Sequence, residues 1–527
     1  MSAKALILCT AILCSWHSFL VSGEEIVSRF FDFNIEEKYA KLSASLDDVN
    51  TSIRSSWPRK DLQIKLSKYL PIAVMSEEGV SDTDYILMGR PIHIVEQEEL
   101  DMKITNKLQA TGLSIHFHGF EMENAIQYDG VVGLTQCPIS PKESFAYKFK
   151  VEESPGTYWY HTHSGPLGVD AHNVIKAPLI VHPNTEKGRA LVDRLNNVNT
   201  TQAPPYRDLL SYDNERILFF SDGFMKSEHM IEMYAIGGLF PPVQENDDGF
   251  VVANMEHDFG TLNGKLREVI YAVPGQKYKL RLMNGGSHFA YRVSIDGIPM
   301  KILATDSNPV KNDPKYTNVD EVIMHNAERF DVEIEIPQDM KPGTSIWIRA
   351  DTLEARKMGY ESGIRGILHV VAQEQDIETM VDNDIADPKG DIKNPPKPVE
   401  EMVTMNCYSK LEKEAAKASG KGGCHNIETL EVYLPPKWNR GLHSVGHASA
   451  TVDFDVTGTP LHAHFARIHD EEVVGKPNWI QFVESSSHVL RPDFDPDRDL
   501  HPHTNMMHVP EYSSVIIIWR SRTIMDQ

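Results

Sequence analysis

Two histidine pairs are the residues of this sequence best suited to chemistry. His116 and His118 stand in the segment Ser-Ile-His-Phe-His-Gly, and His161 and His163 stand in Tyr-Trp-Tyr-His-Thr-His-Ser-Gly. The chain has 23 histidines in 527 residues, so chance alone gives about one His-x-His pair. The apolar and aromatic flanks set these two pairs apart, because they predict that each pair lies on a β-strand.

Side chains two residues apart on a strand point to the same face of the sheet, so both imidazoles of a pair converge. A single histidine on an apolar strand is more often an ordinary core residue. Two convergent pairs in one domain make a nitrogen-rich site that suits copper or zinc. We therefore predict metal ligands at His116, His118, His161 and His163.

The elements that must position these pairs are strands. Tyr278, Leu280 and Leu282 alternate with more polar neighbours, as do Val332 and Ile334. This period of two, punctuated by Pro-Gly and Asn-Gly turns, predicts many short, half-buried strands and an all-β protein.

The chain divides into several blocks. We expect a first domain at 85–183, a second at 210–372 and a third, partial one at 402–527, with an extension at 24–84 that the pattern does not assign. Residues 373–401 are acidic and rich in proline. They predict a linker that cannot bury enough apolar surface to fold alone.

The beginning of the chain reads as a targeting segment. One cation, Lys4, precedes a short apolar run, and small residues at Val21 and Gly23 fit a cleavage site, so residues 1–23 predict a secretory signal peptide. No later run is long enough to span a bilayer. The sequons at Asn50 and Asn199 agree with a secreted, extracellular glycoprotein.

The net charge limits which partners are expected, and the cysteines limit which disulfides can form. A net charge of −23 repels phosphate backbones, so nucleic acid is not an expected partner. Cleavage of the signal leaves Cys137, Cys407 and Cys424. The last two are close enough in sequence to close a loop. Cys137 has no obvious partner, so it is expected either to be buried and free or to pair with a residue that is missing.

Several segments together closely resemble the multicopper oxidases, the family of laccase and ascorbate oxidase. In the first domain these are His116 to Gly119, Asp129-Gly130, 135–139, 144–147 and 155–164. In the second they include 262–264, 278–284, 294–297, 304–306 and 328–332. The resemblance is firm over about 85–372 and weak in the third block.

The resemblance implies tandem cupredoxin domains, which are Greek-key β-sandwiches, two complete here and a third incomplete. In the family a type 1 copper takes electrons one at a time from a phenol or similar small-molecule reductant. It passes them to a three-copper cluster between the first and third domains, which reduces dioxygen to water. By position, His116 would bind the type 2 copper, and His118, His161 and His163 would bind the type 3 pair.

The third block departs from the family pattern. It lacks both the His-Pro-x-His-Leu-His-Gly-His segment and the later His-Cys-His-x-x-x-His segment whose cysteine binds type 1 copper. His462 and His464 imitate the first segment, and 501–508 imitates the second with proline in place of cysteine. We prefer to interpret 508–519 as the strand that precedes the first segment, which leaves the third domain without ligands.

Two classes of function compete on this sequence. The first is a secreted multicopper oxidase that is inactive in this form, because it holds half of the trinuclear ligands and no type 1 site. The second is a cupredoxin that binds copper or zinc without catalysis. A zinc hydrolase is weaker, since it needs a carboxylate base and the nearest ones, Glu121, Glu123 and Asp129, are expected in loops.

Overall fold

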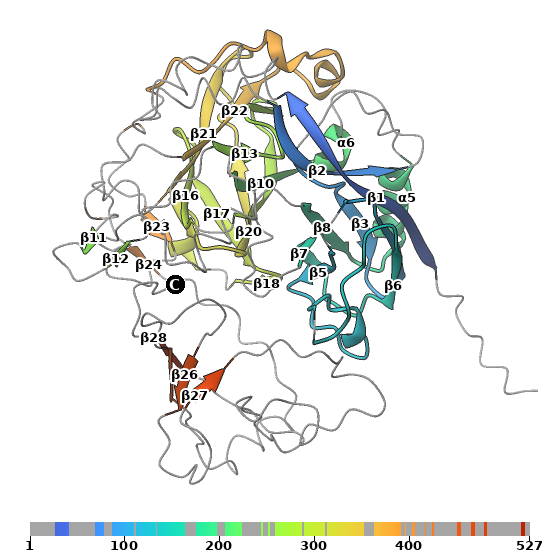
Figure 1. Cartoon of the computed structure of the whole chain (residues 1–527). Helices are drawn as coiled ribbons and strands as arrows, with labels where there is room; N and C mark the ends of the chain where they lie inside the picture. Colours follow the sequence, from blue (N-terminus) through green and yellow to red (C-terminus); the bar gives the residue numbers. More distant parts are fainter. Residues whose placement is uncertain are drawn as a thin grey trace, which may run out of the picture.

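The structure is a computed structural model, shown in Figure 1. It describes residues 27–41, 69–77, 87–109, 112–132, 134–163, 175–197, 206–223, 244–245, 251–252, 259–286, 289–310, 313–352, 363–391, 396, 403–405, 417, 424–425, 451–454, 465–468, 479–481 and 518–521. The predicted signal peptide, both sequons, Cys407 and the histidines from 462 to 508 lie outside the described residues.

The first domain is a sandwich of two four-stranded sheets. One sheet has the order β2-β1-β4-β6, formed by Tyr69–Glu77, Ser28–Lys41, Glu99–Asn106 and Ser144–Lys150. The other has the order β3-β8-β7-β5, formed by Ile92–Val95, Lys176–His182, Gly156–Thr162 and Ile115–His118. Apolar side chains from both sheets meet in one core, as alternating strands require. The predicted all-β fold class is confirmed.

Residues ahead of the predicted boundary at 85 belong to this sandwich. Strand β1 runs parallel to β4, with Phe33 opposite Ile104. Phe31, Phe33 and Ile35 are buried in the core of the first domain. The segment 24–84 is therefore not merely an extension, because its period-two run supplies an interior strand.

The second domain is built on one large sheet. Its main path is β13-β10-β15-β20-β17-β19-β16-β21-β22-β14. In that order the strands are Phe259–Leu262, Glu215–Gly223, Lys277–Asn284, Arg329–Glu335, Met300–Thr305, Val319–Met324, Tyr291–Ile295, Ser345–Thr352, Gly363–Val370 and Glu268–Ala272. Tyr278, Leu280 and Leu282 are buried, as their alternation predicts, and lie opposite Ile334, Val332 and Phe330.

Short strands extend this sheet. β9 (Ser211–Tyr212) pairs with β10, and β18 (Asn308–Pro309) pairs with β17. β23 (Val403–Met405) runs parallel to β19, and β24 (Cys424–His425) runs parallel to β23. Met405 is buried in the core of the second domain, so the start of the predicted third block contributes to the second domain's sheet.

The other elements in the part of the chain that the structure describes are short. α5 (Glu186–Asn196) and α6 (Arg207–Leu210) connect the two domains in sequence, and Thr185 caps α5 by accepting from the amide of Gly188 at 3.0 Å. The 3-10 turns are η1 (Ile126–Tyr128), η3 (Pro314–Tyr316), η4 (Glu374–Thr379) and η5 (Asp382–Asp384). β11 (Gln244–Glu245) pairs with β12 (Val251–Val252), and β25 (Thr451–Phe454), β26 (Phe465–Ile468), β27 (Trp479–Gln481) and β28 (Ile518–Ser521) form a separate sheet.

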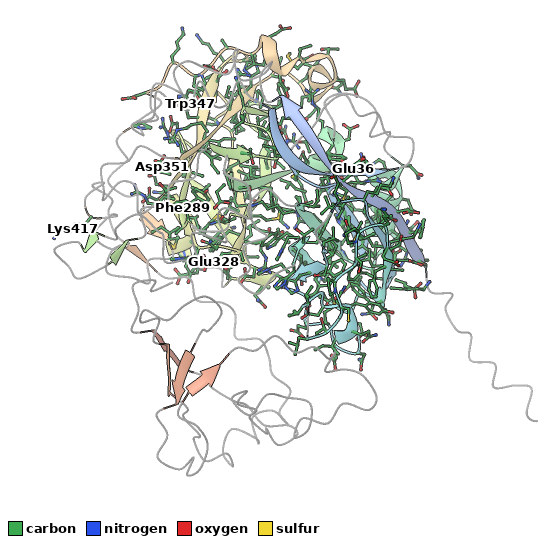
Figure 2. All side chains as sticks on the ribbon, in the orientation of Figure 1. Glu36, Phe289, Glu328, Trp347, Asp351 and Lys417 are labelled. Carbon is green, nitrogen blue, oxygen red and sulfur yellow. The ribbon has the colours of Figure 1, made fainter. Side chains whose placement is uncertain are left out.

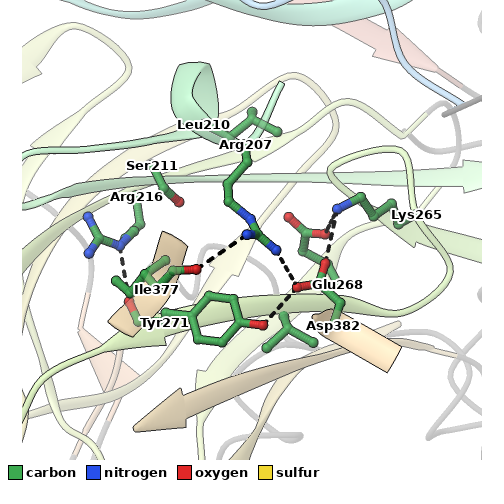
Figure 3. Close-up of a pocket in the computed structure, with 10 residues that line it drawn as sticks. Arg207, Leu210, Ser211, Arg216, Lys265, Glu268, Tyr271, Ile377 and Asp382 are labelled. Carbon is green, nitrogen blue, oxygen red and sulfur yellow. Dashed lines mark hydrogen bonds and ion pairs between the residues drawn. The ribbon is translucent and has the colours of Figure 1, made fainter. Parts of the chain in front are cut away.

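The structure describes residues 373–391 and 396 of the predicted acidic linker. Most of these residues pack on the second domain. The Asp382 carboxylate in η5 accepts from Arg207 and from the hydroxyl of Tyr271, each at 2.8 Å, and lies 3.5 Å from the Lys265 ammonium (Figure 3). Farther along, the indole of Trp347, labelled in Figure 2, donates to the carbonyl of Gly390 at 3.0 Å. Residues 374–391 thus form a strap fixed by charged and aromatic side chains of its neighbour.

Among the described residues, no helix is long and apolar enough to cross a membrane.

Candidate metal centre

The two predicted histidine pairs lie at adjacent antiparallel strands of the first domain, with His163 directly after the end of β7. In the register of β5 and β7, His116 is opposite His161 and His118 is opposite Trp159. Phe117 and Tyr160 are buried on the other face of this sheet, against the core of the first domain. The alternation therefore turns the half-buried histidines away from the core and onto one shared face.

The four predicted imidazoles gather into one group, called the histidine cluster below: His116, His118, His161 and His163. The ring of His116 is centrally placed, with its centroid 5.6 Å from His118, 5.3 Å from His161 and 5.5 Å from His163. Ring nitrogens of His116, His118 and His161 all lie within 4.8 Å of one another. The convergence expected from strand geometry is present in the structure.

Two of these rings are oriented by backbone carbonyls. Nδ1 of His116 is 2.7 Å from the carbonyl oxygen of Asp129, and Nδ1 of His161 is 2.8 Å from that of Thr162. Because a carbonyl only accepts, each Nδ1 carries the proton and donates. In each ring Nε2 therefore keeps its lone pair, which is the form that binds a metal.

The electrostatics also favour neutral rings. Burial, reinforced by the positive charge of Arg329, lowers the pKa of His118 to about 3. Burial likewise depresses the pKa of His161 well below its ordinary value, and that of His163 below its ordinary value, with His116 contributing in both cases. These three imidazoles are neutral near pH 7 and need lose no proton to bind a metal.

The loop beside His116 approaches the strand closely, and only glycine permits it. Gly130 has a φ of +82°, and a Cβ there would stand 1.9 Å from the carbonyl oxygen of Ile115. The hydroxyl of Ser114 donates to the carbonyl of Gly130 at 2.5 Å, which holds the loop in place. Asp129 is thereby set against the ring of His116.

Trp159 is part of the site, and the sequence prediction did not include it. Its ring stacks on His118 with centroids 4.9 Å apart and on His161 with centroids 4.5 Å apart. The period of two in Tyr-Trp-Tyr-His-Thr-His placed Trp159 on the face of His161, so the signal was available in the sequence.

Of the carboxylates weighed for a zinc hydrolase, Asp129 lies against the histidine cluster. Asp129 Oδ1 lies 3.3 Å from Nδ1 of His116, on the nitrogen that already donates to the same residue's carbonyl. Asp129 therefore orients the imidazole of His116 through Nδ1 and leaves its Nε2 available. The side chain of Cys424 lies outside the described residues. Cys137 is a free thiol but an exposed one, so the expectation of a buried cysteine there is wrong.

Comparison with known proteins agrees with this geometry. Two family models, both described as multicopper oxidase, match residues 76–186 and 215–366. The chain belongs to the multicopper oxidase family. The first match covers all four residues of the histidine cluster. It also begins at residue 76, before the predicted boundary at 85.

Among curated multicopper oxidases, the chain is 26% identical over 346 residues to Laccase-1 of Cryptococcus neoformans var. grubii, covering 63% of this chain and 51% of that protein. It is 29% identical over 258 residues to Laccase-2 of Botryotinia fuckeliana, covering 48% and 39%. The chain thus spans about half or less of the length of these relatives.

Solved structures support the fold. The crystal structure of Fet3p, described as a multicopper oxidase that functions in iron import, has a TM-score of 0.52 at 16% identity and covers 84% of this chain and 63% of its own. A point mutant of the laccase from Botrytis aclada has a TM-score of 0.50 at 19% identity, covering 84% and 64%. At these identities the likeness concerns the cupredoxin-like architecture alone.

Multicopper oxidases use copper, and the donor set here is suited to it. Neutral imidazole nitrogens are good ligands for divalent copper, which exceeds zinc in affinity for such sites. The cluster offers three ring nitrogens within 4.8 Å of one another. Two of the three rings, those of His116 and His161, are held as Nδ1–H tautomers and present Nε2 as the ligand atom.

Proposed function

We propose that the histidine cluster holds copper in a secreted, laccase-like protein. The observation that carries this is the convergence of His116, His118 and His161, with ring nitrogens within 4.8 Å of one another and Nε2 available on at least two of them. Bound copper would supply the one-electron chemistry by which such proteins oxidise small-molecule reductants, phenols or similar, with dioxygen as acceptor. The chain's own residues orient and desolvate the ligands.

Copper content tests this proposal directly. Purified protein loaded with copper and then dialysed should retain the metal, and His116→Ala/His161→Ala should lose most of it. His369→Ala is a matched control, since this imidazole of the second domain bonds Ser345 at 2.9 Å and lies outside the cluster. Equal copper in wild type and the double variant would refute the site and leave four ordinary imidazoles.

We further propose that this chain alone does not turn over substrate. Its sequence contains no His-Cys-His-x-x-x-His segment, so it offers no thiolate-bound copper through which electrons enter. The copper-loaded protein should lack an intense visible charge-transfer band and should not consume oxygen with a phenol, ascorbate or ferrous iron. A strong band, or oxygen uptake above a copper-free control, would contradict this; copper retention without uptake fits the alternative of a non-catalytic cupredoxin.

A further inference from the structure

In the sheet formed by β3, β8, β7 and β5, one face carries the histidine cluster. The second domain covers the other end of that same face. Thr157, Trp159 and His161 follow one another on this face of β7. Figure 1 shows β7 and β8 on the side of the first domain that is next to β20 and β18. The strand that supplies His161 therefore also contacts the second domain.

One contact beside the cluster joins two aromatic rings across the domains. Phe219, on β10, lies with its ring centroid 5.9 Å from that of Trp159, and both side chains are buried. Trp159 in turn stacks on His118 and His161. A continuous line of rings thus leads from the second domain to two imidazoles of the cluster.

Trp159 depends on packing for its orientation. Its indole nitrogen is buried and has no hydrogen-bond partner among the described residues, so no directional bond fixes the ring. The neighbouring rings of Phe219, His118 and His161 set its position instead. In a close-packed interior, a shift of one such ring displaces the next.

Phe219 itself is fixed through its backbone. Its amide donates to Asn263 Oδ1 at 2.9 Å, and its carbonyl accepts from the amide of Asn263 at 2.8 Å. Gly285 leaves the space for the ring, because a Cβ at that position would stand 2.2 Å from Phe219 Cζ. The carbonyl of Gly285 accepts from Lys176, which lies opposite His161 on β8, at 2.8 Å.

We propose that Phe219 is a positioning residue for the histidine cluster, acting through Trp159. The inference rests on the proposed function only for its copper readout, since the ring geometry exists without metal. Packing of Phe219 keeps Trp159 flat against His118 and His161. Both imidazoles are then held in the orientation in which their nitrogens converge with those of His116.

Two adjacent residues of β10 give a matched pair of variants. Phe219 and Phe220 are each 1% exposed, but Phe219 packs in the core of the first domain and Phe220 in that of the second. Phe219→Leu and Phe220→Leu remove the same atoms from equally buried sites. Only the first touches the line of rings, so general destabilisation and positioning can be told apart.

The decisive measurement uses metal-free protein with ¹³C-labelled histidine. Imidazole signals of His118 and His161, assigned through His→Gln variants, should move in Phe219→Leu and stay in place in Phe220→Leu. Gly285→Ala, which displaces the Phe219 ring without removing it, should move the same signals. Phe219→Met offers a milder change if the leucine variant folds poorly. Unmoved signals in Phe219→Leu, or equal movement in Phe220→Leu, would overturn the proposal.

Copper affinity supplies the second readout. Phe219→Leu should weaken copper binding about tenfold, the lower end of the losses seen when residues supporting metal ligands are changed. It should also alter the electron paramagnetic resonance spectrum of bound copper, whereas Phe220→Leu should change neither. If wild type retains no copper, the proposed function fails, and the metal-free spectra still decide whether Phe219 positions the rings.

Discussion

The hydroxyl of Thr157 in the first domain donates to Asp331 Oδ1 in the second at 2.6 Å, in a fully buried position. The same hydroxyl accepts from Arg281 Nη1 at 2.7 Å, and the carbonyl of Thr157 accepts from Arg329 Nε at 3.0 Å. Three charged residues of the second domain thus hold one residue of β7, four positions before His161. The two domains share a polar joint at the strand that carries the site.

Thr157→Val should destabilise the protein by about 1–3 kcal/mol, because it leaves a buried carboxylate and a buried guanidinium each one partner short. Urea unfolding of the metal-free protein measures this. Thr105→Val is the control, since its hydroxyl bonds Ser144 at 2.9 Å on the exposed side of the first domain. It should cost within about 0.5 kcal/mol. Equal losses for the two variants would mean that the joint between the domains adds nothing.

Asp382→Ala should release the strap at 374–391. The substitution removes the acceptor shared by Arg207 and Tyr271, and leaves those two donors without that partner. We expect faster cleavage of the strap in limited proteolysis. Asp384→Ala, a change to an exposed carboxylate in the same turn, should be cleaved at the wild-type rate. Identical cleavage of both variants would show that the carboxylate of Asp382 does not hold the strap.

Local patterns in the sequence predicted the strands and the convergence of the four histidines, because both follow from the period of two. The alternation in β1 was equally readable, yet its pairing with β4 joins Phe33 to Ile104, far apart in sequence. The contact between Trp159 and Phe219 depends in the same way on how two domains pack. Composition alone also predicted a linker at 373–401, since nothing local shows that Arg207 and Tyr271 lie beneath Asp382.

Two further histidines, outside the histidine cluster, predict how the stability of the protein depends on pH. His93 and His182 are buried, with His93 Nδ1 2.9 Å from His182 Nε2 and His93 Nε2 donating to the carbonyl of Leu209 at 2.9 Å. Burial lowers the pKa of His93 well below its ordinary value and that of His182 to about 3. Both rings therefore stay neutral in the folded protein at pH values where the unfolded chain protonates them.

Because the folded pKa values are depressed, stability is fully present above the unfolded pKa of about 6.5 and declines as pH falls toward 3. Between pH 7.5 and 5.5 each of these rings should cost about 1.4 kcal/mol of unfolding free energy. Urea midpoints of the metal-free protein at the two pH values measure the loss. His182→Gln should show a smaller loss, and an unchanged pH dependence in that variant would contradict the assignment.

Alanine substitutions at two glycines with similar φ values can separate the cost of backbone strain from the cost of a steric clash. Gly130 and Gly297 have φ values of +82° and +73°, so alanine at either position carries the cost of a left-handed conformation, about 1–2 kcal/mol. A Cβ added at Gly297 would meet nothing within 4 Å, whereas one at Gly130 would stand 1.9 Å from the Ile115 carbonyl oxygen. Gly130→Ala must therefore also push the Asp129 loop off β5. It should lose more stability in urea than Gly297→Ala and should shift the imidazole signal of His116, whose Nδ1 donates to Asp129. If the two variants lose equal stability and leave His116 unmoved, the loop does not orient that ring.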